Sequence, residues 1–160
     1  MLVDGQEPFA VVFGCVDSRV PPEGVFDRGL GDLLVIRTAG QTIDEAVLGS
    51  VEYGAAALGI PLVTVLGHQQ CGAVEAAMQA LDVGATSEGS IGSIVDRIAP
   101  AVHSSSGEGD ERLDRAVRAN IDNVVARLRR SPILSELEGE GELVIVGAHY
   151  TLGSGVVEFM

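Results

Sequence analysis

The sequence is poor in aromatic residues and cysteine, and it contains no tryptophan. Aromatic residues make up only 4% of its 160 residues, whereas 46% are hydrophobic, so valine, leucine, isoleucine and alanine must build most of the core. A chain of this length is the size of one ordinary domain. The 21 glycines permit close backbone approaches, and the composition favours a single α/β domain over residues 1–160.

Positive charge is also scarce. The chain has 10 Lys and Arg against 23 Asp and Glu, which gives a formal net charge of −13. Because such a surface repels nucleic-acid phosphates and anionic lipid headgroups, we expect no nucleic-acid and no membrane partner. No stretch approaches the ~20 apolar residues of a membrane span, and residues 1–4 lack the basic start of a signal peptide. We therefore expect a cytoplasmic protein.

Short apolar runs alternate along the chain with segments of helical spacing. Runs that are apolar throughout predict buried parallel strands, here at residues 8–14, 33–36, 61–66 and 142–146. Helical patterns fall at residues 44–58, 71–81 and 113–128, and stretches rich in Gly and Ser predict loops at 84–92 and 103–109. The sequence thus predicts a mostly parallel central β-sheet flanked by helices, with a short edge strand at residues 156–159 near the C-terminus.

The helix predicted at residues 113–128 carries arginines on its polar face. Such a face could bind an anion, but acidic residues interleave with the arginines: the set is Arg112, Asp114, Arg115, Arg118 and Asp122. Alternating charge of this kind is typical of a solvated face laced with ion pairs. We therefore assign this face no functional role.

The only two cysteines follow predicted strands. Cys15 comes directly after the first strand, His68 follows the third, and Cys71 falls in the first turn of the next predicted helix. The carboxyl ends of parallel strands meet at one edge of a sheet, so these side chains are expected to lie together. Two thiolates and one imidazole suit Zn²⁺, and three protein ligands leave a tetrahedral metal one position for water. The pattern predicts a catalytic zinc site.

The sequence around these residues is more specific than the ligands alone. Residues 15–19 read CVDSR, and residues 68–72 read HQQCG. Together these strings resemble the signatures of the β-class carbonic anhydrases, and the resemblance extends over nearly the whole chain, from about residue 5 to residue 159. It implies an enzyme that converts carbon dioxide and water reversibly to bicarbonate and a proton.

The resemblance also assigns roles to individual residues. It implies that Cys15, His68 and Cys71 permanently hold one zinc ion per chain and that Asp17 and Arg19 form the catalytic pair. In that reading a zinc-bound hydroxide attacks CO2, and Asp17 orients it by accepting its hydrogen bond. Arg19 keeps Asp17 ionised and off the metal, although Asp17 could become the fourth zinc ligand if released.

The resemblance extends to the substrate pocket and to assembly. Gln6 and Tyr53 stand where some relatives place residues that contact bicarbonate, often across a dimer interface, which implies a homodimer or a dimer of dimers. Only residues 1–7 precede the first strand, so the usual helical arm is expected to be missing. Val12 replaces the Trp of relatives with a bicarbonate-regulated closed site, and we therefore expect an open resting state.

Two other functions share these features. One is the hydrolysis of carbon disulfide by the same fold and metal. The other is a non-catalytic zinc protein, in which Asp17 completes a closed set of four ligands. The remaining histidines, His103 and His149, have no second ligand at metal spacing and are placed outside the site.

Overall fold

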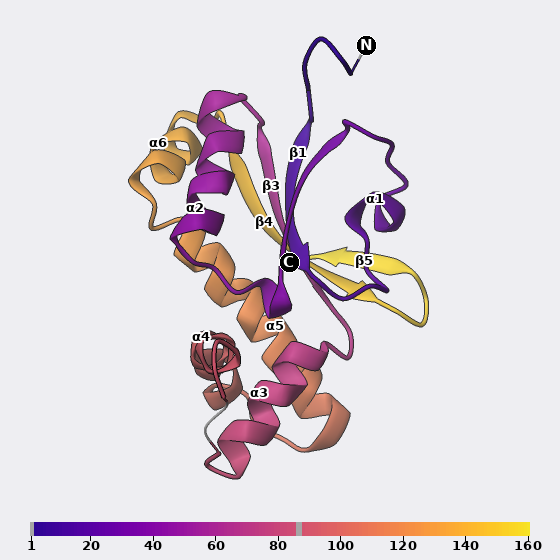
Figure 1. Cartoon of the computed structure of the whole chain (residues 1–160), viewed down its shortest axis with the longest axis vertical. Helices are drawn as coiled ribbons and strands as arrows, with labels where there is room; N and C mark the ends of the chain where they lie inside the picture. The colour runs from indigo at the N-terminus through magenta and orange to yellow at the C-terminus, as the bar shows by residue number, and fades with distance from the viewer. Residues whose placement is uncertain (1, 86–87) are drawn as a thin grey trace.

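Five strands form one sheet in the computed structural model, which describes residues 2–85 and 88–160. The strand order is β2-β1-β3-β4-β5 (Figure 1). The strands are β1 (Ala10–Cys15), β2 (Leu33–Thr38), β3 (Leu62–His68), β4 (Val144–Thr151) and β5 (Val156–Phe159). Strands β1 to β4 run parallel, and β5 is antiparallel to β4 at one edge. The predicted sheet and its C-terminal edge strand are confirmed.

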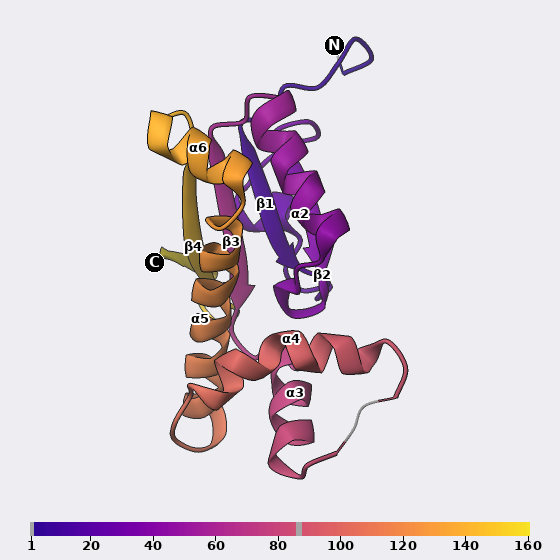
Figure 2. The same cartoon turned by 90° about the vertical axis from the view of Figure 1, so that its left-hand side faces the viewer.

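The helices cover the sheet and extend below it. They are α1 (Pro22–Val25), the 3-10 turn η1 (Ala39–Gln41), α2 (Glu45–Glu52), the π-helical η2 (Tyr53–Ala57), α3 (Gly72–Asp82), α4 (Ile91–His103), α5 (Gly109–Leu128) and α6 (Pro132–Glu140). Figure 2 shows α2, α5 and α6 on one face of the sheet, with α3 and α4 beyond the ends of the strands. None of the helices in the described part of the chain has the length and apolar character needed to span a bilayer.

The predicted helices at residues 44–58, 71–81 and 113–128 are all present, but the loop at residues 84–92 is only partly correct. Residues 86–87 lie outside the described residues, and α4 already begins at Ile91. Ile94, Val95 and Ile98 follow at the spacing of a helix face, and Val95 and Ile98 are buried. The apolar spacing of these residues therefore indicated the helix better than the Gly and Ser content of the preceding stretch indicated a loop.

The main core lies between the sheet and the helices. Phe13 of β1, Val65 of β3 and Ile145 of β4 pack in one cluster with Ile121 and Leu128 of α5. A smaller cluster on the opposite face joins β1, β3 and β4. The helix-covered face thus supplies most of the apolar burial that stabilises the domain.

Helix α5 approaches the sheet at two glycines. A β-carbon added to Gly67 would lie 2.5 Å from Cδ1 of Ile121, and one added to Gly147 would lie 2.7 Å from Cγ2 of the same residue. Both distances are shorter than real β-carbon contacts, so a larger residue at either strand position would require Ile121 to shift. Because His68 follows Gly67 at the end of β3, this packing also positions the edge where the functional side chains gather.

Candidate metal centre

Cys15, His68 and Cys71 converge beyond the carboxyl ends of β1 and β3. Their ligand atoms all lie within 4.8 Å of one another, and all three side chains are buried. The two sulfur atoms are 4.0 Å apart. Cys15 ends β1, His68 ends β3, and Cys71 is the N-cap of α3 instead of lying in its first turn. The structure thus brings together the three side chains that the sequence singled out.

The orientation of His68 leaves one ring nitrogen for a ligand. Nδ1 lies 3.0 Å from the carbonyl oxygen of Gln69, and because a carbonyl only accepts, Nδ1 carries the proton and donates it. Nε2 is fully buried and has no hydrogen-bond partner among residues 2–85 and 88–160. A buried acceptor without a partner is costly, and a metal ion between Nε2 and the sulfur atoms would satisfy it.

The two cysteines are electrostatically coupled. Their hydrogen bond lowers the pKa of Cys15 to about 4, and the same bond, reinforced by burial, raises the pKa of Cys71. Burial lowers the pKa of His68, but the nearby Cys15 sulfur and its negative charge outweigh this and raise the pKa. The pair holds one negative charge readily, and a second thiolate needs a cation beside it. The cluster therefore suits a thiophilic metal ion.

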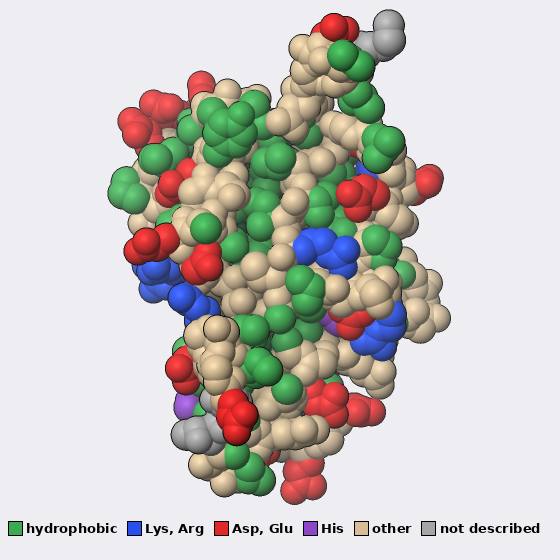
Figure 3. Space-filling model, in the orientation of Figure 1, with side chains coloured by type: hydrophobic (Ala, Val, Ile, Leu, Met, Phe, Trp, Pro, Cys, Tyr) green, Lys and Arg blue, Asp and Glu red, His purple; other side chains and the backbone are tan. Residues whose placement is uncertain are grey.

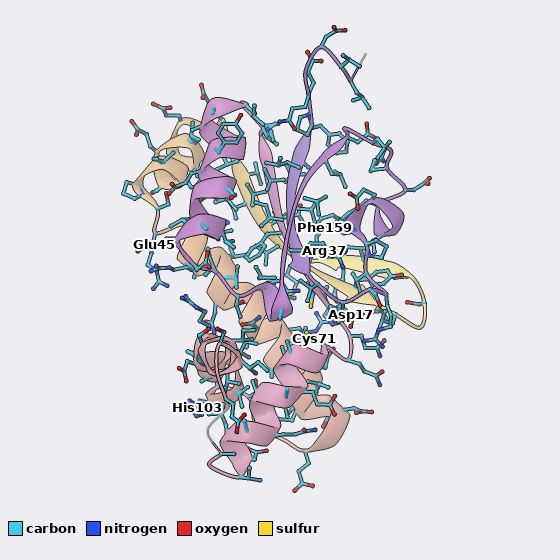
Figure 4. The ribbon with its side chains drawn as sticks, viewed as in Figure 1. Asp17, Arg37, Glu45, Cys71, His103 and Phe159 are labelled. Atoms are coloured by element: carbon cyan, nitrogen blue, oxygen red, sulfur yellow. The ribbon has the colours of Figure 1, made fainter. Side chains whose placement is uncertain are left out.

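Asp17 lies beside this cluster, and Arg19 binds both oxygens of its carboxylate. Nε of Arg19 donates to Oδ1 at 2.9 Å, and one terminal nitrogen donates to Oδ2 at 2.7 Å. This bidentate contact lowers the pKa of Asp17 to about 2, so the carboxylate is ionised at neutral pH. Oδ2 lies 3.9 Å from Nε2 of His68, and Figure 4 shows Asp17 close to Cys71 at the lower end of the strands. Asp17 is thus an ionised acceptor next to the candidate metal position.

Further residues hold the loop that carries Cys15 and Asp17. The guanidinium of Arg37 donates to the carbonyl oxygens of Cys15 at 2.7 Å and of Asp17 at 2.6 Å. The backbone N–H of Gly40 donates to the Cys15 sulfur at 3.4 Å, and Asn120 of α5 donates to the carbonyl oxygen of Gly40 at 2.7 Å. Sequence reasoning gave these residues no such role. The available signal was the charge of Arg37 directly after the apolar run of residues 33–36.

The residues assigned to the substrate pocket do not lie at this cluster. Gln6 is exposed in the segment before β1, whose opposite end carries Cys15. Tyr53 is 54% exposed where α2 passes into η2, and it borders a surface depression with Leu34 and Ile36 of β2. Within one chain, neither side chain is brought to the candidate metal position.

The two other histidines also lie apart from the cluster of ligand atoms. His103 is exposed at the end of α4 and is well separated from Cys71 in Figure 4. His149 is buried in β4, where Nε2 lies 3.2 Å from Oδ1 of Asp114 and Arg118 approaches Nδ1 at 3.5 Å. Neither histidine belongs to the group of possible metal ligands within the described residues.

Comparison with known proteins gives one consistent result. The family model described as carbonic anhydrase matches residues 10–157. Carbonic anhydrase 2 of Mycobacterium tuberculosis is 47% identical over 155 residues, which cover 96% of this chain and 75% of that protein. The carbonic anhydrase of Mycolicibacterium smegmatis is 46% identical over 158 residues, covering 98% of this chain and 77% of the relative. The solved β-carbonic anhydrase of Coccomyxa, in complex with acetazolamide, matches with a TM-score of 0.85 and 26% identity over 98% of this chain and 73% of that one.

Proposed function

Since the chain belongs to the β-class carbonic anhydrase family, we propose that it holds one zinc ion per chain and catalyses the reversible hydration of CO2 to bicarbonate and a proton. The observation that carries this proposal is the buried cluster of Cys15, His68 and Cys71. Nε2 of His68, which has no hydrogen-bond partner among the described residues, faces Asp17, and Arg19 holds that carboxylate. Family membership supports the reaction, and the cluster supports the metal.

The donor set and its dimensions fit zinc. Two thiolates at about 2.3 Å from a tetrahedral metal lie roughly 3.8 Å apart. The observed separation of the Cys15 and Cys71 sulfur atoms is 4.0 Å, so little movement is needed. Zinc held by these two cysteines and His68 would supply a Lewis acid that lowers the pKa of a coordinated water toward ~7. Both thiolates would donate charge to the metal and so lower the pKa of that water less. The neighbouring residues would therefore contribute more to activating it.

Asp17 would accept a hydrogen bond from the attacking oxygen and orient its lone pair toward CO2. Its pKa of about 2 keeps it ionised throughout the neutral range, so it can accept but not donate. Arg19 occupies both carboxylate oxygens and also donates to the carbonyl oxygen of Gln70 at 3.2 Å, beside Cys71. Through these contacts Arg19 would keep Asp17 away from the metal and favour an open resting site.

The substrate pocket would be completed by a second copy of the chain. Gln6 and Tyr53 lie away from the cluster within one chain, as expected if the partner subunit provides them in a homodimer or a dimer of dimers. We assign both to substrate binding on this basis. The two free cysteines would persist as thiolate ligands in a reducing compartment, which supports a cytoplasmic location.

The test combines zinc content with CO2 hydration. The purified protein should contain about one zinc per chain, hydrate CO2 in stopped flow, and lose this activity on chelation of the metal. Cys71→Ser should lose zinc and turnover together, because serine cannot replace a soft thiolate. Full hydration activity in zinc-free Cys71→Ser would contradict the proposal. Sulfide release from carbon disulfide, measured in parallel, would show whether that linear substrate is preferred instead.

A further inference from the structure

A polar cavity lies apart from the candidate metal centre, between the segment from η1 to the start of α2 and the helices α4 and α5. Its volume is about 420 Å³. Three arginines border it: Arg97 of α4, Arg127 of α5 and Arg130 just after α5. We call it the arginine cavity. Figure 3 shows arginine side chains gathered at the left edge of the molecule, at the level between the beginning of α2 and α4 in Figure 1.

The three arginines of this cavity form no ion pair with a carboxylate of the described residues, unlike half of the arginines in the chain. All 10 positively charged residues are arginines, since the sequence contains no lysine. Half of them form ion pairs with a carboxylate: Arg19, Arg112, Arg115, Arg118 and Arg129. Arg97 donates to the carbonyl oxygen of Ile43, whereas Arg127 and Arg130 have no side-chain hydrogen bond or ion pair with any described residue. Three of the five arginines without a carboxylate thus converge on one cavity.

A structural role explains only part of this arrangement. Arg127 lies in the last turn of α5, where a positive charge interacts favourably with the helix dipole. That effect does not account for Arg97, which belongs to a different helix. The polar face of α5 further toward its N-terminus behaves differently, because Arg112, Arg115 and Arg118 are all paired with acids. Convergent guanidinium groups repel one another, and an anion between them would offset that repulsion.

The inner wall offers polar groups that are already held in place. Gln41 is 2% exposed and Asn120 is 3% exposed, and both line the cavity. One N–H of Gln41 donates to the carbonyl oxygen of Leu66, and one N–H of Asn120 donates to that of Gly40. Each amide has a second N–H for a ligand. Pro100 and Val124 add apolar surface beside these groups.

We propose that the arginine cavity binds a phosphate group, either as free phosphate or as the phosphate ester of a small organic molecule. Guanidinium groups bind phosphate oxygens in a bidentate manner and keep their charge at any physiological pH. The volume of about 420 Å³ falls within the range of small-molecule sites and leaves room for a carbon skeleton against Pro100 and Val124. The net charge of −13 opposes anion binding here only weakly, because salt screens exposed charges that lie more than about 8 Å away.

The cavity connects to the metal centre through two hydrogen bonds. Asn120 donates to the carbonyl oxygen of Gly40, and the N–H of Gly40 donates to the sulfur of Cys15. Gly40 has a φ of 61°, a conformation that other residues rarely adopt, so this link depends on glycine. A phosphate that contacts Asn120 would therefore alter the surroundings of the Gly40 amide.

The experiment is an NMR titration of the full chain at constant ionic strength with sodium chloride. Inorganic phosphate and glycerol 3-phosphate are the two probes. Saturable shifts are expected at the Gly40 amide and at the side-chain amides of Gln41 and Asn120. The double variant Arg127→Gln/Arg130→Gln should weaken binding by about 10-fold or more. The matched control is Arg28→Gln, since Arg28 also lacks a carboxylate partner and lies over Phe9, away from the cavity.

The outcomes separate the possibilities. Tighter binding of inorganic phosphate identifies free phosphate as the ligand, and tighter binding of glycerol 3-phosphate identifies an ester. An absence of saturable binding by both probes would overturn the proposal. Equal weakening by Arg28→Gln would also overturn it, because the effect would then reflect total charge. Binding is read from chemical shifts, so the result is independent of whether the chain hydrates CO2.

Discussion

His68 and His149 are two buried histidines on adjacent strands, and their surroundings differ in kind. They are 0% and 2% exposed, and neither Nε2 makes a well-aligned hydrogen bond within the part of the chain that is described, although Oδ1 of Asp114 lies 3.2 Å from that of His149. Nε2 of His68 faces two cysteines and Asp17. His149 instead faces Asp114 and Arg118 in the first half of α5 and Glu158 of β5. Burial and a missing partner therefore do not identify a metal ligand. The neighbouring donor atoms do.

The same contrast appears in the acid–base properties of the two rings. The Cys15 sulfur outweighs burial and raises the pKa of His68. Burial, reinforced by the positive charge of Arg118, lowers the pKa of His149, although Asp114 and Glu158 oppose the shift. One ring lies in a negative environment that attracts a cation. The other ring is kept neutral.

The largest expected effect is the loss of metal from only one of the two histidine variants. His68→Gln removes a ligand, so zinc content and CO2 hydration should fall together, with hydration reduced by more than about 100-fold. His149→Gln is the matched control and should retain zinc, with turnover within about 3-fold of the unchanged chain. Metal analysis and stopped flow on both proteins make the comparison. Equal loss of zinc from both would remove the distinction between the two sites.

A smaller effect is expected from the carboxylate beside each histidine. Asp17→Asn should keep zinc bound but reduce turnover by about 10- to 100-fold, because the attacking oxygen loses an anionic hydrogen-bond acceptor. Asp114→Asn removes the same charge next to His149 and should leave turnover nearly unchanged. The measurements are kcat and zinc content for both variants. Unaltered turnover in Asp17→Asn would show that Asp17 has no catalytic role and only forms an ion pair with Arg19 in the loop.

The smallest effect concerns stability below neutral pH. The pKa of His149 is lowered in the folded chain, so below about 6.5 the unfolded chain binds more protons there, and stability falls as pH falls toward the folded pKa. His149→Gln should make the unfolding free energy less dependent on pH between about 7 and 5. The difference cannot exceed about 1.4 kcal/mol per pH unit for one proton. Denaturant titrations at several pH values measure it, and parallel curves for both proteins would contradict it.

The sequence allowed the strands and the Cys–His–Cys cluster to be predicted because both depend on local patterns. Apolar runs located β1 to β4, and the positions of Cys15, His68 and Cys71 just after strands placed them at one edge. The contacts of Arg37 and Asn120 with backbone carbonyls could not be predicted, because they arise only when distant segments pack together. The same limit applies to the arginine cavity.

The roles of Gln6 and Tyr53 remain predictions for a related reason. The structure places both at the surface of one chain, and their function requires a second chain. Helix α4 is a different case, since its apolar spacing was visible in the sequence but was masked by the Gly- and Ser-rich stretch before it. Contacts between distant segments and between chains were therefore harder to predict from this sequence than its helices and strands.

The fit of Ile121 against Gly67 and Gly147 constrains how this chain can change over evolutionary time. A methyl group at Gly67 would lie 2.5 Å from Cδ1 of Ile121, so the Ile121 side chain or the backbone that carries it would have to shift. A smaller residue at position 121 would create that room, but it would leave a void if it arose first. The three positions are therefore expected to covary among relatives, so that an enzyme with alanine at position 67 carries a smaller side chain at position 121.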